Sequence, residues 1–88
     1  MCDKYDKVEL PSPVWMTRKR RATIEVDACC VPVLEHLWAN GVDTLYHCCG
    51  HSPTYEEPYI ILAASCTVPA ADVKTLVRQV DTRQWNIR

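Results

Sequence analysis

Five side chains able to bind a metal ion fall in two short clusters of this 88-residue sequence. Cys29 and Cys30 form the first cluster, and Cys48, Cys49 and His51 form the second. Thiolate and imidazole donors together suit zinc better than harder ions. The Cys-x-x-His spacing from Cys48 to His51 lets one turn direct a sulfur and a nitrogen at the same ion, and the glycine between them permits such a turn. These residues therefore predict a zinc site.

Two predicted strands and the helix between them bring the clusters together. Residues 22–26 alternate apolar and polar side chains, which predicts a strand buried on one face. The helix begins near Cys29, because Pro32 fits only in a first turn, and it ends before Gly41. Residues 42–48 alternate again and form the second strand. Since a strand–helix–strand crossover makes the two strands parallel, their carboxyl ends lie at the same edge.

The rest of the chain predicts a second unit of the same kind. The apolar run at 59–64 indicates a buried strand, and a helix with Pro69 in its first turn follows. Residues 85–87 indicate a final edge strand. The order βαββαβ is that of a ferredoxin-like split βαβ, so we predict a single α+β domain over residues 21–88, preceded by an extended N-terminal arm over residues 1–20. The second helix places its apolar side chains at helical spacing, at Val73, Leu76, Val77 and Val80.

Cys29, Cys48 and His51 form the centre of the predicted ligand set. The partial positive charge at the start of the first helix favours the thiolate that a metal ion requires. Neighbouring residues in a strand point to opposite faces, so Cys48 and its neighbour both bind only where the strand has ended. Cys66 ends the antiparallel third strand and is excluded, because it lies at the opposite edge. The fourth position is open to Cys49, Cys30, Glu56, Glu57 or water, and we add Cys49 to the predicted set.

Three other interpretations use the same residues, and one of them is a redox or disulfide role for the thiols. Cysteine is among the most frequently buried residue types, so the clusters can be simple core packing. Alternatively, an ion with one open position, or Cys48 as a nucleophile with His51 as its base, makes the domain a small hydrolase. In that case Glu56 or Glu57 is a candidate general base. We favour a site without catalytic activity, because 88 residues rarely enclose a large pocket.

Composition limits the class of partner and the compartment. Ten basic and eleven acidic side chains give a formal net charge of −1, which makes nucleic acid an unlikely partner. The basic run Arg18–Arg21 is the one feature that favours a nucleic-acid-binding module. No apolar run is long enough for a membrane span, and the N-terminus lacks the apolar segment of a signal peptide. We therefore expect a cytoplasmic protein whose cysteines are ligands rather than a disulfide framework.

The cysteine motifs also carry a resemblance. Asp27-Ala28-Cys29 precedes the helix, Gly41 and Val42 lead into the next strand, and residues 44–51 end in Cys-Cys-Gly-His. This pattern resembles a group of small phage and bacterial proteins that share Asp-x-Cys, a Gly-apolar-x-Thr turn and a Ser-Cys-x-Gly-His ending. The match covers about residues 22–64.

The resemblance implies a ligand set and an origin. Cys29, Cys48 and His51 fall on shared positions, Cys49 on a variable one, and His47 stands where serine is commoner. The resemblance implies a phage protein, for which a host protein in the host cytoplasm is the expected partner. We therefore predict a small zinc-binding protein that acts by binding a macromolecule. Homodimer formation is a further expectation, because exposed edge strands commonly pair.

Overall fold

The computed structural model describes residues 7–13, 15–16, 22–50 and 57–88. It has an α+β fold, which confirms the predicted class. The strands are β1 (Lys7–Pro11), β2 (Thr23–Asp27), β3 (Thr44–Cys48), β4 (Tyr59–Leu62) and β5 (Asn86–Ile87). A 3-10 turn, η1 (Ala28–Cys30), precedes helix α1 (Val31–Ala39), and the second helix is α2 (Ala70–Arg78).

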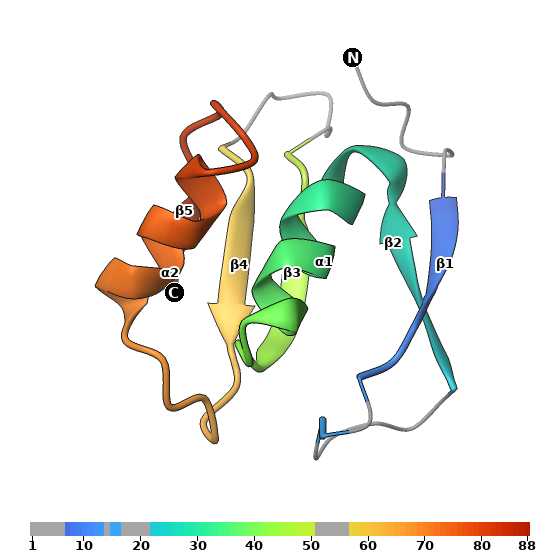
Figure 1. Ribbon diagram of the computed structural model, residues 1–88. Helices are drawn as coiled ribbons and strands as arrows, with labels where there is room; N and C mark the ends of the chain where they lie inside the picture. Colours follow the sequence, from blue (N-terminus) through green and yellow to red (C-terminus); the bar gives the residue numbers. More distant parts are fainter. Residues whose placement is uncertain (1–6, 14, 17–21, 51–56) are drawn as a thin grey trace.

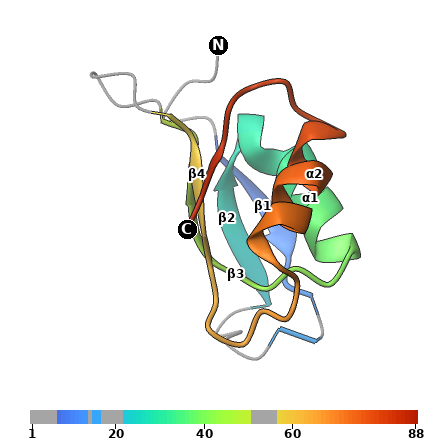
Figure 2. The same cartoon turned by 90° about the vertical axis from the view of Figure 1, so that its left-hand side faces the viewer.

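The strands form two separate sheets rather than one. β1 pairs antiparallel with β2, whereas β3, β4 and β5 form a second sheet in which β4 is central. Both helices lie on the same side of the strands (Figures 1 and 2). A ferredoxin-like arrangement is not confirmed, because β4 pairs with β3 and β5 but not with β2 in the described part of the chain.

The N-terminal arm supplies one strand of the first sheet. Lys7 to Pro11 pair with Asp27 to Thr23, and the Ser12 N–H continues the ladder by donating to the Ala22 carbonyl oxygen at 2.9 Å. Pro11 fits here because it lies opposite Thr23 where no N–H is needed. The extended conformation predicted for this segment thus takes the form of a paired strand over Lys7–Pro11.

Helix α1 begins one residue later than the sequence predicts. Cys30 rather than Cys29 is its N-cap, because η1 intervenes, and Pro32 lies in the first turn as expected. The helix ends at Ala39 with Asn40 as its C-cap, and Gly41 follows with a φ of +76°. This left-handed conformation is the one that glycine adopts most readily after a helix.

The two helices pack against the sheets through one apolar core. α1 buries its predicted stripe completely at Leu34 and Leu37, and α2 buries Val73 and Val77. Val80, which the helical spacing placed on the same stripe, follows the end of α2 and is exposed. The core also includes Val26, Cys30, Val33, Trp38, Val42, Ile60 and Trp85.

Neither described helix has the length and apolar character that a membrane crossing requires. Each has nine residues, whereas a membrane span needs about 20.

Candidate metal centre

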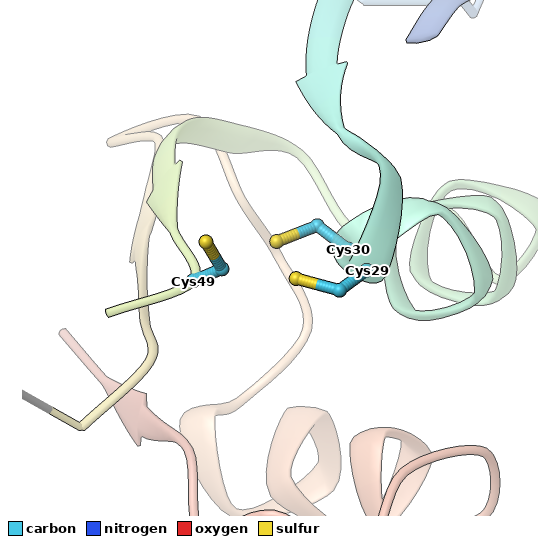
Figure 3. Close-up of side chains that lie close together, drawn as sticks. All are labelled: Cys29, Cys30 and Cys49. Atoms are coloured by element: carbon cyan, nitrogen blue, oxygen red, sulfur yellow. The ribbon is translucent and has the colours of Figure 1, made fainter. Parts of the chain in front are cut away.

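Three sulfur atoms from two distant parts of the chain meet at one end of the molecule. Cys29 and Cys30 come from η1, Cys49 follows β3, and the three Sγ atoms all lie within 4.8 Å of one another. Figure 3 shows the Cys29 and Cys30 side chains directed toward Cys49. None of the five described cysteines forms a disulfide. The two cysteine clusters therefore converge, as the crossover topology predicted, in a group that could hold a metal ion.

The 3-10 turn explains how two adjacent cysteines contribute to one cluster. In a strand, Cys29 and Cys30 would point to opposite faces. In η1, successive side chains are separated by about 120°, so both sulfurs reach the same region. The chain begins this turn directly after Asp27, whose backbone is still extended at a ψ of 136°. Local backbone geometry thus determines the cluster.

The predicted ligands separate into three groups. Cys29 and Cys49 lie in the cluster, whereas the Cys48 sulfur is not part of it and accepts a hydrogen bond from the Gly50 N–H at 3.5 Å. His51 lies outside the described residues, as do Glu56 and the basic run Arg18–Arg21. Glu57 is described and exposed.

The sequence left the fourth ligand position open to several residues, and the structure brings one of them, Cys30, into the cluster. It is fully buried, and its position beside Cys29 in the sequence was the one available signal for it. Cys66, which topology excluded, lies outside the cluster, and its thiol donates to the Val68 carbonyl oxygen at 3.6 Å. That exclusion agrees with the observed geometry.

Burial controls the protonation of the innermost thiol. Burial raises the pKa of Cys30 well above its ordinary value, and the nearby Cys29 and Cys49 sulfurs raise it further. Without a cation this thiol stays protonated, because a buried thiolate is poorly solvated. A metal ion bound here must therefore displace the Cys30 proton.

An acidic side chain and a lysine border the cluster. Burial acts to raise the pKa of Asp27, but hydrogen bonds from Lys7 and from the Cys49 thiol outweigh it, so the pKa lies below the ordinary value. Lys7 and Asp27 form an ion pair between β1 and β2. Asp27 therefore connects the first sheet to the sulfur cluster.

An arginine from the C-terminal part of the chain reaches the cluster from the other side. Asp81 accepts hydrogen bonds from the Arg83 Nε atom at 3.0 Å and from its Nη2 atom at 2.6 Å. The Arg83 Nη1 atom lies 3.6 Å from the Cys29 sulfur and donates to it. The ion pair with Asp81 fixes the guanidinium, so a positive charge is held beside Cys29.

No protein-family model, curated protein or solved structure matches this chain. The resemblance to phage and bacterial proteins therefore stays a prediction from the sequence motif. On its own geometry, the chain is a small α+β domain with a three-thiol cluster at one end of two sheets.

Proposed function

We propose that this chain is a zinc-stabilised domain and that Cys29, Cys30 and Cys49 bind the ion. The observation that carries the proposal is the mutual distance of 4.8 Å or less among the three sulfurs. Three sulfurs at a Zn–S distance of about 2.3 Å in tetrahedral geometry lie about 3.8 Å apart. The cluster therefore needs only to contract by about 1 Å to surround the ion.

The position of the cluster favours a structural role for the metal. No backbone hydrogen bond joins β2 to β3 among the described residues. An ion held by η1, which follows β2, and by Cys49, which follows β3, would connect the two sheets directly. Small domains with limited cores often depend on such a cross-link. Burial of Cys30 and Cys49 also limits access of a substrate to the ion.

His51 is the proposed fourth ligand. It lies two residues after Cys49 in the chain, and a Cys3His set is a usual donor set of structural zinc sites. Cys48, which the motif favoured, is the alternative to Cys30 in this set. Separate substitutions of Cys30 and Cys48 show which of the two binds the ion. In the structure the Cys48 sulfur accepts a hydrogen bond from the Gly50 N–H and is not part of the cluster.

The proposed role of the zinc-stabilised domain is to bind a macromolecular partner, which would be a host protein for a phage-encoded chain. Large apolar side chains on β3 support this role. Leu45 is 50% exposed and Tyr46 is 55% exposed. They lie where the register of β3 shifts between Thr44 and Tyr46, which interrupts the regular alternation of faces, and exposed apolar side chains of this size are typical of interaction surfaces.

Metal analysis of the purified chain tests the zinc site. We expect one zinc per chain in the wild type, no stoichiometric zinc in Cys30→Ala and Cys49→Ala, and unchanged zinc in the matched control Cys66→Ser. Cys29→Ala adds a variant at a partly exposed position, where the substitution disturbs the core less. Retention of one zinc by all three cluster variants, or its absence from the wild type, would contradict the proposal.

A further inference from the structure

A groove of about 390 Å³ separates the two sheets. Ile24 and Glu25 of β2 line one side, Tyr46 and His47 of β3 line the other, and Trp38 of α1 contributes to the lining between them. Figure 1 shows the order of the strands across the molecule, with β1 and β2 on one side and β3 and β4 on the other. The groove therefore lies between an edge of each sheet.

Among the described residues, no strand pairs with the edge of β2 that faces away from β1. Pro11 lies opposite Thr23 and has no N–H, so these two residues form a non-hydrogen-bonded pair. The next two residues, Ser12 and Ala22, form a hydrogen-bonded pair. Bonded and non-bonded pairs alternate along an antiparallel ladder. Thr23 and Glu25 therefore direct their backbone N–H and C=O groups away from β1, toward the groove.

The facing edge of β3 has the same property. The Leu62 N–H donates to the Arg88 carbonyl oxygen at 2.8 Å, and the Arg88 N–H donates to the Ile60 carbonyl oxygen at 2.8 Å. Leu62 and Ile60 thus direct their backbone groups to β5, so their partners Thr44 and His47 are in non-bonded pairs. The backbone groups of Thr44 and His47 therefore point away from β4, toward the groove.

We propose that the groove binds an extended segment of a partner protein, which adds a strand between β2 and β3. This inference rests on the partner-binding part of the proposed function and names its surface and ligand class. An inserted strand would hydrogen-bond to both edges at once and join the two sheets into one. Backbone pairing supplies affinity in such strand addition, and side-chain contacts supply specificity.

The lining residues determine which side chains the segment carries. Lys7 and Asp27 pair with each other, whereas Glu25 is exposed and forms no ion pair with a described residue. Among the described residues that line the groove, the acidic Glu25 and Asp27 therefore outnumber the basic Lys7, which favours lysine or arginine in the segment. Trp38 and Ile24 offer apolar surface that favours valine or isoleucine on the opposite face of the segment. The predicted ligand is an extended peptide in which basic and β-branched residues alternate.

Binding of a synthetic hexapeptide tests the proposal on the full-length, zinc-loaded chain. The probe is fluorescein-labelled Lys-Val-Lys-Val-Lys-Val, and its affinity is measured by fluorescence anisotropy at fixed salt. We expect saturable 1:1 binding, with amide chemical-shift changes at Glu25 and His47. Glu25→Lys should weaken binding about fivefold, whereas the matched control Glu35→Lys, at an exposed position of α1 that does not line the groove, should not. Absence of saturable binding would overturn the proposal.

Two N-methylated versions of the peptide distinguish insertion from attachment to one edge. Methylation of the three valine nitrogens blocks one side of the peptide backbone, and methylation of the three lysine nitrogens blocks the other. Insertion requires both sides, so each version should lose at least tenfold in affinity. Tolerance of either version would overturn insertion between the strands.

Two further measurements separate this proposal from its alternatives. Sedimentation of the chain without peptide shows whether a second copy fills the groove, and a dimer that the peptide dissociates would overturn the proposed occupant. Zinc is determined on the same samples. If the chain contains no zinc but still binds the peptide, the zinc proposal is wrong and the groove proposal stands. If the chain contains zinc but does not bind the peptide, the groove proposal is wrong and the zinc proposal stands.

Discussion

Arg83 binds Cys29 through two atoms of its guanidinium group. The Nη2 atom donates to the Cys29 carbonyl oxygen at 2.9 Å, and the Nη1 atom donates to the Cys29 sulfur at 3.6 Å. The two residues are 54 positions apart in the chain, so the C-terminal segment holds the backbone of η1 in place. A hydrogen bond to a metal-binding sulfur orients the ligand and stabilises its charged form.

Arg83→Ala should therefore weaken zinc binding by about tenfold to 100-fold. The substitution removes both the positive charge beside the Cys29 sulfur and the bond to its carbonyl oxygen. Competition with a chromophoric zinc chelator measures the change in Kd. Arg78→Ala is the matched control, because Arg78 is exposed on α2 and has no bond to the cluster. Equal zinc affinity in the two variants would refute the positioning role of Arg83.

Cys48→Ser should leave zinc content at one ion per chain, whereas Cys30→Ala should remove it. The Cys48 sulfur interacts with the Gly50 N–H, and the Cys30 sulfur belongs to the cluster. The absorption of Co²⁺-substituted protein adds a readout, since the thiolate-to-cobalt bands should persist in Cys48→Ser. The opposite result, loss in Cys48→Ser and retention in Cys30→Ala, would restore the ligand set of the sequence motif.

The sequence predicted the meeting of the two cysteine clusters, because crossover topology alone brings the ends of parallel strands to one edge. It left Cys30 among several candidates for the fourth position and did not single it out as a partner of Cys29. That outcome depends on the 3-10 turn between Asp27 and α1, which has no strong sequence signal beyond Pro32. The contact of Arg83 with Cys29 depends on tertiary packing, and no feature of the sequence indicated it.

Asp81→Asn should destabilise the chain at pH 7 by about 1 kcal/mol. Burial acts to raise the pKa of Asp81, but hydrogen bonds from Arg83 outweigh it and lower the pKa below the ordinary value. A carboxyl group whose pKa is lower in the folded state stabilises the fold above its unfolded pKa of about 3.9, and this contribution is lost as pH falls through the folded pKa.

Urea unfolding at a series of pH values measures this contribution. The difference between wild type and Asp81→Asn should be constant from pH 7 to about pH 5 and should close below about pH 4. Because Asp81 also fixes Arg83 beside Cys29, the zinc content of both chains is measured at each pH, which separates acid release of zinc from loss of the Asp81 charge. A difference that stays the same down to pH 2 would show that the Asp81 charge does not contribute.

Gly41→Ala should cost about 1 kcal/mol of stability. Gly41 has a φ of +76°, and a Cβ atom there would meet nothing within 4 Å, so the cost is one of backbone conformation and not of collision. Gly41→Asn should cost less than half as much, because asparagine adopts this conformation more readily. Equal unfolding midpoints for wild type and Gly41→Ala would contradict this account of how α1 ends.

The elements themselves were largely predictable, but their pairing was not. Alternation at 22–26 and 42–48 and the apolar run at 59–64 correspond to β2, β3 and β4. The sequence predicted an extended arm over residues 1–20, but not that Lys7–Pro11 would pair with β2 as a strand. Proline tolerates an edge strand where its nitrogen faces no acceptor, and Pro11 lies at such a position opposite Thr23.

X-ray absorption at the zinc edge of the purified wild-type chain tests the three-sulfur site most directly. We predict stoichiometric zinc with three sulfur neighbours at about 2.3 Å and one lighter neighbour at about 2.0 Å. A first shell made only of nitrogen and oxygen atoms, or no bound zinc, would contradict the assignment of Cys29, Cys30 and Cys49 as ligands.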